Sequence, residues 1–399
     1  MNDLERVRSW FESGTLLPPD ASVANTVDLA RALASIAGTN VELGAGATNV
    51  RDAIGETEHL VFMLIDGLGM NLIDALPAGS FLREHVALEL RAVFPATTAA
   101  ALTSLATGLW PAQHAVPAWW TYLPERGLSA TVLPFVERFS ERPLAELGVR
   151  GEDVFGSPTL IASFPRDTLS FMPRQLADTV YTRYVLAGTP IDGYETFRDA
   201  VDGAVARIER AASATYTYIY YPAVDALEHV HGPASQEVRA ELMRVELELA
   251  RLARAVAGRG RVVVSADHGV LAVEQQHRYV MEPDDPLLES LEAPPYGEPR
   301  VPFFRVRDGA SDAFASRFRE RYGGDFALLS IDDADELRLF GPEPLSATAR
   351  GRIGDYIAVP EAARVLVDSS VRDKHGPGLM RGFHGGMMRE EMRIPLVVA

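Results

Sequence analysis

The chain has 399 residues, of which 47% are hydrophobic, and it carries a formal net charge of −17 at pH 7. This length suits one main domain that holds a smaller inserted one, and the apolar content is ample for a core. Because the sequence contains no cysteine, it excludes disulfides, thiolate metal sites and cysteine nucleophiles. The acidic charge argues against long nucleic acid as a partner, since such binding needs a positive surface, but it leaves a small phosphorylated substrate open.

No targeting or membrane-spanning segment is visible in the sequence. The N-terminus lacks a basic start followed by an apolar run, which a secretory signal would need. No stretch approaches the roughly 20 apolar residues that cross a bilayer. We therefore expect no membrane span and a cytoplasmic location, whereas the sequence leaves the oligomeric state open.

Three apolar runs each lead to an aspartate, and each has the length and composition of a buried strand. In chain order the runs are residues 60–65 before Asp66, residues 216–221 before Asp225, and residues 262–264 before Asp267. Helical patterns cover residues 195–212 and 235–256. Strands that alternate with helices predict an α/β fold with a central, mostly parallel sheet flanked by helices. Ligands of such sheets gather at the carboxyl ends of the strands, where these aspartates are expected.

A short helix is predicted to begin at Thr98 and to end before Gly108, with Pro111 just beyond. Its N-terminus would direct unpaired backbone N–H groups and the positive end of the helix dipole at an anion near Thr98. Thr97 is the alternative hydroxyl at this position, and either threonine could instead serve only as the N-cap.

The segment between His268 and His384 has a βαβ-like pattern of its own. Apolar runs at residues 301–306 and 326–331 enclose a helical pattern at residues 311–322. Because candidate metal ligands lie on both sides of this segment, we interpret it as an insertion into the main domain.

The predicted insertion is a small α+β cap. We place the cap at residues 276–365 and the catalytic α/β core at residues 1–275 and 366–399. The Pro- and Gly-rich stretches at residues 292–302 and 373–378 are expected to cross between the two lobes.

The candidate metal ligands are Asp66, Asp225, Asp267, His229, His268 and His384, together with Thr98 if its hydroxyl ionises to an alkoxide. Converging carboxylates repel one another unless cations lie among them. Two divalent ions would leave the three aspartates with one net positive charge, which attracts a phosphate, and an ionised Thr98 would bring the sum to zero. Imidazole and carboxylate ligands without thiolates favour Zn²⁺, with Mn²⁺ or Fe²⁺ as alternatives. This set around one hydroxyl is typical of a two-metal phosphoryl-transfer hydrolase.

The motifs that carry these residues resemble one known family. VFPATT at residues 93–98 and ATGLWPAQH at residues 106–114 are similar to the nucleophile region of type I phosphodiesterases and nucleotide pyrophosphatases, in the alkaline phosphatase superfamily. DALEHVHGP at 225–233, ADHG at 266–269 and HG at 384–385 resemble the remaining ligand motifs of that family, in the same chain order. The likeness covers nearly the whole chain and implies an alkaline-phosphatase-like core.

The resemblance implies one zinc on Asp225, His229 and His384 and another on Asp66, Asp267 and His268, with Thr98 facing both. It also implies cleavage of small phosphodiester or pyrophosphate bonds through a phosphothreonine on Thr98, which water then hydrolyses. The family usually has an asparagine three residues after the nucleophile, where this chain has Ala101. This departure weakens the expectation of a nucleotide substrate and leaves the metal ligands unaffected.

Several alternatives stay open. A phosphate or phosphonate monoesterase could use the same two-zinc core, and a relative without catalysis could keep the fold to bind a metal or a ligand. Trp119 and Trp120 could form a stacking platform for a base or an apolar leaving group, or they could pack in the core. His231 could be mistaken for a ligand, but a four-residue step puts His229 on the same side of a helical turn as Asp225.

Overall fold

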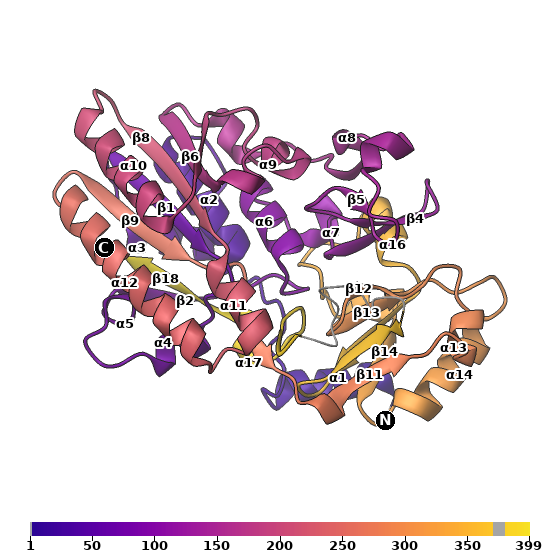
Figure 1. The fold of residues 1–399 in the computed structure, drawn as a ribbon. Helices are drawn as coiled ribbons and strands as arrows, with labels where there is room; N and C mark the ends of the chain where they lie inside the picture. The colour runs from indigo at the N-terminus through magenta and orange to yellow at the C-terminus, as the bar shows by residue number, and fades with distance from the viewer. Residues whose placement is uncertain (1, 370–379) are drawn as a thin grey trace.

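The computed structural model describes residues 2–369 and 380–399, so the predicted crossing at residues 373–378 lies outside the described residues. Figure 1 shows two lobes side by side, each with a sheet at its centre. Both of these sheets have seven strands. None of the described helices combines the length and the apolar character that a membrane crossing needs.

The central sheet of the first lobe has the strand order β2-β18-β9-β1-β8-β6-β7. Its strands are β2 (Val86–Arg91), β18 (Arg393–Val398), β9 (Gly260–Ser265), β1 (His59–Ile65), β8 (Thr215–Tyr221), β6 (Asp167–Pro173) and β7 (Ile191–Tyr194). β1 pairs in parallel with β8 and β9, and β6 pairs in parallel with β8 and β7. Within this sheet only β18 runs antiparallel to its neighbours, so the predicted mostly parallel sheet is confirmed.

Helices cover both faces of the central sheet (Figure 1). On one face lie α10 (Phe197–Arg210) and α12 (Gln236–Val256), and on the other lie α2 (Thr26–Ala37), α3 (Ala45–Ile54) and α6 (Thr98–Thr107). The two predicted long helices correspond to α10 and α12. Every position of β1 is buried, as expected of a strand that is covered on both faces.

Further helices belong to both lobes (Figure 1). They include α1 (Asp3–Glu12), α4 (Met70–Ala75), α5 (Phe81–Glu84), α7 (Pro111–His114), α8 (Gly151–Val154), α9 (Val180–Val185), α11 (Ala223–His231), α13 (Pro286–Glu289), α15 (Ile331–Glu336), α16 (Ala347–Ile353) and α17 (Arg389–Met392). Two small ribbons pair β10 (Leu271–Ala272) with β17 (Gly382–Phe383), and β11 (Arg278–Met281) with β16 (Val365–Asp368).

The carboxyl ends of β1, β8 and β9 meet at one edge of the central sheet. Asp66 directly follows β1, and its backbone N–H donates to the carbonyl oxygen of Tyr221 at the end of β8, at 2.9 Å. The backbone N–H of Asp225 in turn donates to the carbonyl oxygen of Asp66, at 3.1 Å. Because the three strands are parallel neighbours, Asp267 reaches the same edge from β9.

The β10–β17 ribbon brings His384 to this edge from the far end of the chain. Gly382 of β17 lies against α11, and a Cβ at this position would lie 2.4 Å from the carbonyl oxygen of Glu228. Only glycine permits such a close approach of two backbones. The ribbon therefore sets the position of His384 relative to α11.

The second sheet is antiparallel and has the order β14-β15-β13-β12-β3-β4-β5. Its strands are β14 (Phe326–Ser330), β15 (Tyr356–Pro360), β13 (Val301–Phe304), β12 (Tyr296–Glu298), β3 (Trp120–Leu123), β4 (Leu128–Thr131) and β5 (Val136–Glu137). The predicted strand, helix and strand of the insertion correspond to β13, α14 (Ser311–Tyr322) and β14. Three strands of the sheet, β3, β4 and β5, come from the segment after α6. The boundaries of the core and the cap stay a prediction.

Residues 292–302 do not form a free crossing between the lobes. They contain β12 and the first part of β13, because Tyr296 pairs with Phe303 across a tight turn. Pro299 lies in the two-residue turn of this hairpin, between Glu298 and Val301.

A buried ion pair joins the lobes next to this turn. Arg300 donates from Nε and Nη2 to the two carboxylate oxygens of Glu391 on α17, at 2.9 Å each. Its Nη1 also donates to the carbonyl oxygens of Ala362 and Arg364. Both ionic side chains are fully buried, so each depends on the other for its charge partner.

Replacing Arg300 by Met should lower the free energy of unfolding by about 3–5 kcal/mol, because the Glu391 carboxylate would be left buried without its cation. Urea unfolding of the purified variant measures this change. The matched control is Arg174→Met, which breaks a pair with Glu195 whose side chains are 63% and 65% exposed, and which should change stability by less than about 0.5 kcal/mol. Similar losses in the two variants would contradict the inference.

Candidate active site

The predicted ligands lie in two groups at the carboxyl edge of the central sheet. One group consists of Asp66, Asp267 and His268, and the other consists of Asp225, His229 and His384. Within each group, one possible ligand atom from every residue lies within 4.8 Å of the others. Folding thus brings together side chains from four separate stretches of sequence.

The first group is buried. Asp267 accepts hydrogen bonds at Oδ1 from the backbone N–H groups of Gly67 (3.1 Å) and His268 (3.0 Å). Asp66 accepts a hydrogen bond at Oδ2 from the Tyr220 hydroxyl. The opposite oxygens, Oδ1 of Asp66 and Oδ2 of Asp267, have no hydrogen-bond partner among the described residues. They lie 3.6 Å and 3.3 Å from Nε2 of His268.

The second group lies on α11 and directly after β17. Nε2 of His229 lies 3.3 Å from Oδ2 of Asp225, one helical turn earlier. Nε2 of His384 lies 3.9 Å from Oδ1 of Asp225, an oxygen for which the described part of the chain offers no hydrogen bond. The His384 ring also stacks on His268, with 3.8 Å between the ring centroids, so the two groups are in contact.

The three imidazoles are oriented by main-chain carbonyl groups. Nδ1 of His229 lies 2.9 Å from the carbonyl oxygen of Gly382. Nδ1 of His268 lies 3.3 Å from the carbonyl oxygen of Gly269, and Nδ1 of His384 lies 3.1 Å from that of Ala96. Because a carbonyl oxygen only accepts, Nδ1 of each neutral ring carries the proton and Nε2 keeps its lone pair. This arrangement is typical of histidines that bind a metal through Nε2.

The electrostatics of the cluster favour cations. Burial raises the pKa of Asp66 well above its ordinary value, and the neighbouring Asp267 and Asp225 raise it further. Burial lowers the pKa of His384 well below its ordinary value, and the two adjacent imidazoles lower it as well. Crowded carboxylates beside three imidazoles, with three carboxylate oxygens that accept no hydrogen bond within the described part of the chain, form a donor set that fits divalent metal ions.

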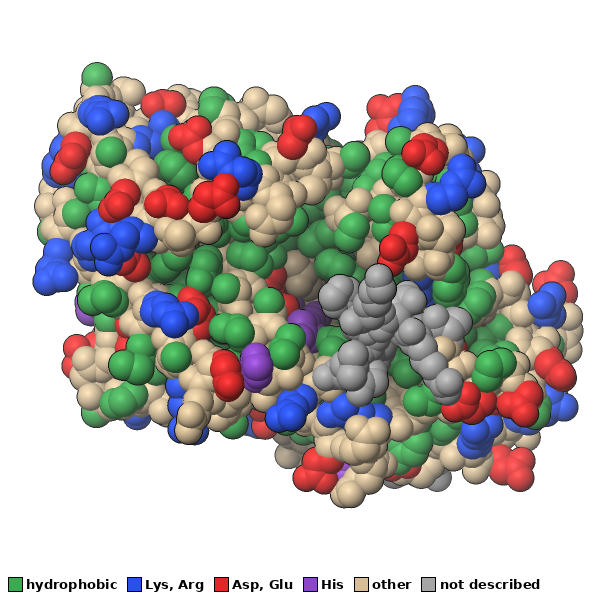
Figure 2. All heavy atoms as spheres, in the orientation of Figure 1, with side chains coloured by type: hydrophobic (Ala, Val, Ile, Leu, Met, Phe, Trp, Pro, Cys, Tyr) green, Lys and Arg blue, Asp and Glu red, His purple; other side chains and the backbone are tan. Residues whose placement is uncertain are grey.

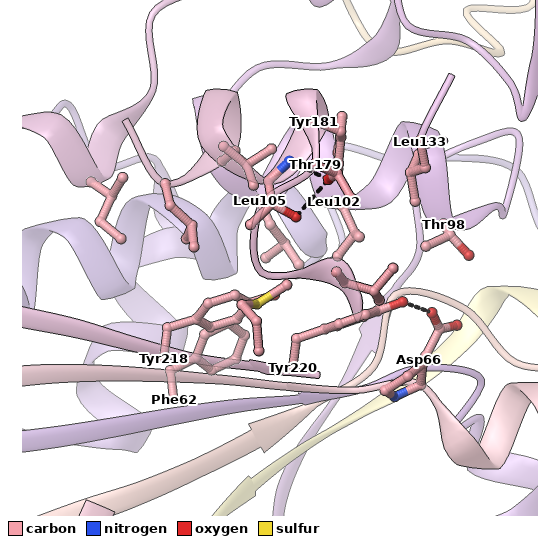
Figure 3. Close-up of a pocket in the computed structure, with 18 of the residues that line it drawn as sticks. Phe62, Asp66, Thr98, Leu102, Leu105, Leu133, Thr179, Tyr181, Tyr218 and Tyr220 are labelled. Atoms are coloured by element: carbon pink, nitrogen blue, oxygen red, sulfur yellow. Dashed lines mark hydrogen bonds between the residues drawn. The ribbon is translucent and has the colours of Figure 1, made fainter. Parts of the chain in front are cut away.

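Thr98 is the first residue of α6 and is buried. Its Oγ1 lies 3.2 Å from Nε2 of His268, so the hydroxyl donates to this nitrogen. The N-cap residue Thr97 makes no side-chain hydrogen bond to the first turn, which leaves the N–H groups at the start of α6 for an anion. Thr98 lines the same cavity as Asp66 and Asp225, and Figure 3 shows it opposite Asp66.

The two tryptophans differ in position. Trp119 lines the cavity. Trp120 packs instead against Arg138, whose guanidinium carbon lies 4.0 Å from the centroid of the Trp120 ring. Trp120 is not among the cavity-lining residues that the structure describes. Ala101 is buried in a small apolar cluster that includes Val93, so this position offers no donor to a substrate. The substrate-binding role of the two tryptophans stays a prediction.

Sequence reasoning missed two residues that support the site. The hydroxyl of Tyr220 donates a hydrogen bond to Asp66. The only sign of this role in the sequence was the alternation of tyrosines along β8, because every second residue of a strand faces the same side. Glu298 of β12 is buried and accepts a hydrogen bond from the backbone N–H of Trp119, at 2.7 Å. A Cβ at Gly385, next to His384, would lie 2.9 Å from Cβ of Glu298. The second sheet therefore contacts the site through Glu298, which belongs to none of the sequence motifs.

Glu228 is a further buried carboxyl group beside the cluster. It lies on α11, and neither of its carboxylate oxygens has a hydrogen-bond partner in the part of the chain that is described. Burial raises its pKa well above the ordinary value, and Asp225 and Asp267 raise it further. Burial and the two aspartates therefore disfavour the charged form of Glu228.

Comparison with known proteins identifies a family. The family model described as type I phosphodiesterase / nucleotide pyrophosphatase matches residues 60–386. This span contains both ligand groups and Thr98. No curated protein matches the chain.

Solved structures share the fold. Murine ectonucleotide pyrophosphatase/phosphodiesterase 5 matches with a TM-score of 0.63 at 15% identity, over 84% of this chain and 87% of that chain. An inactive form of the murine protein in complex with AMP gives 0.62 at 17% identity, over 86% and 87%. Phosphonoacetate hydrolase from Sinorhizobium meliloti, in complex with phosphonoacetate, gives 0.59 at 18% identity, over 85% and 89%. Identities this low establish a common fold and no more.

The two ligand groups predict two tightly held divalent ions per chain. Replacing His229 by Ala should reduce the content to about one ion, because its group keeps only two donors. Elemental analysis of dialysed protein measures the content. The control is His231→Ala, since His231 lies 3.8 Å from Glu237 and belongs to neither group. If both variants lose the same amount of metal, the assignment of His229 is wrong.

Burial raises the pKa of Glu298 to about 7 from an ordinary value of 4.5, and this shift predicts a pH effect on stability. Between these two values the folded state holds a proton that the unfolded chain has released, so the free energy of unfolding falls as the pH rises. Glu298→Gln should therefore gain stability relative to the parent from pH 5 to pH 7, by at most about 3 kcal/mol. Urea unfolding of metal-stripped protein tests this, and parallel pH profiles would contradict it.

Proposed function

Because this chain belongs to the type I phosphodiesterase and nucleotide pyrophosphatase family, we propose that it cleaves phosphodiester or pyrophosphate bonds of small molecules with Thr98 as the nucleophile. Membership of this family makes the chain a hydrolase of the alkaline phosphatase superfamily. The observation that carries the proposal is the position of Thr98. It stands at the N-terminus of α6, against His268 of one ligand group, in a cavity that Asp225 of the other group also lines.

Two divalent ions are part of the proposal, since superfamily members use two. We assign one to Asp66, Asp267 and His268 and the other to Asp225, His229 and His384. We propose Zn²⁺, with Mn²⁺ or Fe²⁺ as alternatives, because the donors are oxygens and imidazole nitrogens. Bound ions would supply Lewis acid character, which polarises a phosphoryl oxygen and lowers the pKa of a nearby hydroxyl.

The remaining steps follow from the protein's own groups. Oγ1 of Thr98 releases its proton to solvent and attacks phosphorus, the bond from phosphorus to the leaving oxygen breaks, and a phosphothreonine forms. A water oxygen then attacks the same phosphorus, the bond from phosphorus to Oγ1 breaks, and a proton from that water restores the Thr98 hydroxyl. The N–H groups at the start of α6 donate to the phosphoryl oxygens, and the helix dipole favours the negative charge that gathers there.

A diester is favoured over a monoester by the charge of the cavity. The additional charge of a monoester calls for cationic side chains, but the described lining contains no lysine, arginine or histidine. A diester brings a second organic group instead, which an apolar lining accommodates. A phosphate or phosphonate monoesterase is the second candidate, because phosphonoacetate hydrolase shares the fold. A relative without catalysis is disfavoured by the complete set of ligands around Thr98.

Replacing Thr98 by Ala should lower kcat by on the order of 10³-fold or more, because the nucleophile is lost. The metal content should stay that of the parent, as measured by elemental analysis. Thr97→Ala is the matched control and should stay within about tenfold of the parent, since only a packing contact at the N-cap changes. A Thr98→Ala variant with parental turnover would place the nucleophile elsewhere.

The substrates for this assay are a phosphodiester and a phosphate monoester that release the same 4-nitrophenol. The proposal expects the diester to have the larger kcat/KM, and it expects both reactions to depend on Thr98. A larger kcat/KM for the monoester would favour the second candidate function.

A further inference from the structure

A deep cavity opens directly on the proposed nucleophile. Its volume is about 560 Å³, within the range of small-molecule sites. Figure 3 shows Thr98 and Asp66 at one end, and Phe62 and Tyr218 at the other. On the surface, Figure 2 shows a hollow between the lobes in which hydrophobic side chains predominate. A group bound in the cavity would therefore be attached to the phosphorus that Thr98 attacks.

The central sheet forms the floor of the cavity. Tyr216, Tyr218 and Tyr220 alternate along β8 and all line it, because every second residue of a strand faces the same side. Phe62 of β1 pairs with Tyr218 in the parallel register and lines the floor beside it. From Tyr216 to Tyr220 the strand rises about 13 Å. This length suits a chain that runs along the sheet better than a single ring.

The walls of the cavity are apolar. They include Leu33, Leu102, Leu105, Leu160, Met172 and Leu186. Aromatic rings in the lining pack against one another: Phe62 stacks on Tyr218 with centroids 5.8 Å apart, and Phe164 meets Tyr216 edge to face at 4.9 Å. Each of these rings has a neighbouring ring in the lining, so together with the aliphatic side chains they form a continuous apolar wall.

Two of the tyrosine hydroxyls in the lining are engaged by the protein. The Tyr220 hydroxyl donates to Asp66, and the Tyr181 hydroxyl lies 3.0 Å from that of Thr103. The charged side chains of the described lining are Asp66 and Asp225, which belong to the ligand groups. A nucleoside would find few partners for the polar atoms of its base and sugar, because most of the lining side chains are aliphatic or aromatic, and each unpaired polar atom weakens binding.

We propose that this cavity binds an open-chain hydrocarbon substituent of the phosphoester, so that the substrate is a lipid-like phosphodiester rather than a nucleotide. The inference rests on the proposed hydrolase function and adds its substrate class. Specificity then comes from the burial of methylene groups beside Thr98, where each one contributes up to about fourfold to kcat/KM.

The first test is a series of 4-nitrophenyl alkyl phosphodiesters with methyl, butyl, octyl and dodecyl groups, used below their micelle-forming concentrations. We expect kcat/KM to rise with chain length, by at least about a hundredfold from methyl to octyl, and the octyl ester to exceed the 4-nitrophenyl ester of thymidine 5′-phosphate. Equal values along the series, or a larger value for the thymidine ester, would overturn the inference and leave the hydrolase function intact.

A variant that fills the cavity provides the second test. Ala106 of α6 lines it, and Ala106→Trp should lower the dodecyl-to-methyl ratio of kcat/KM by about tenfold or more. The matched control is Met243→Trp, which adds the same ring at a site on α12 that is 70% exposed. The control should keep the parental ratio, and an unchanged ratio in Ala106→Trp would count against the proposal.

A binding measurement separates the proposed hydrolase function from the inference about its substrate. Metal-stripped protein is loaded with a dye that fluoresces in apolar surroundings, and dodecanol or thymidine is added as competitor. The inference predicts displacement of the dye by dodecanol in the parent and weaker displacement in Ala106→Trp, whether or not any ester is hydrolysed. If dodecanol displaces the dye but no phosphoester is cleaved by the metal-loaded protein, the proposed function fails alone; if only thymidine displaces it, the inference fails.

Discussion

Three carboxylates that converge at one edge of the central sheet constrain the rest of this structure. Asp66, Asp225 and Asp267 reach the same point because β1, β8 and β9 are adjacent and parallel. In a low-dielectric interior their charges repel, and only cations or protons relieve the repulsion. The protein donors satisfy one oxygen each of Asp66 and Asp267 and leave the other free. This edge of the sheet therefore offers carboxylate oxygens to a cation without a rearrangement of the protein.

The neighbouring groups are arranged to keep this edge ready for metal. Main-chain carbonyl groups fix the protons of the three imidazoles on Nδ1, which leaves Nε2 available in each ring. Burial and the neighbouring aspartates raise the pKa of Glu228, which disfavours a further negative charge beside the ligand groups. The second lobe contributes from the opposite side, through Glu298 beside Trp119 and through the buried pair of Arg300 with Glu391.

Much of this could be predicted from the sequence because local patterns carried it. The apolar run before Asp66 and the helix from Thr98 follow from composition and from start and stop signals. Tyr220 and Glu298 could not be predicted, because a tyrosine in a buried strand and a glutamate near a turn have no distinctive neighbours. Their roles arise from contacts with residues more than a hundred positions away.

The sequence by itself determined the α/β core, the identity of the six candidate ligands and the hydroxyl at the start of α6, because each lies in a short motif with its own chemical character. Only the tertiary structure decided that β3, β4 and β5 join the second sheet, and that α2, α6 and α9 enclose an apolar cavity over β8. Sheet membership and cavity shape depend on pairings between distant segments. Such pairings are selected by the packing of the whole chain, and no single stretch of sequence records them.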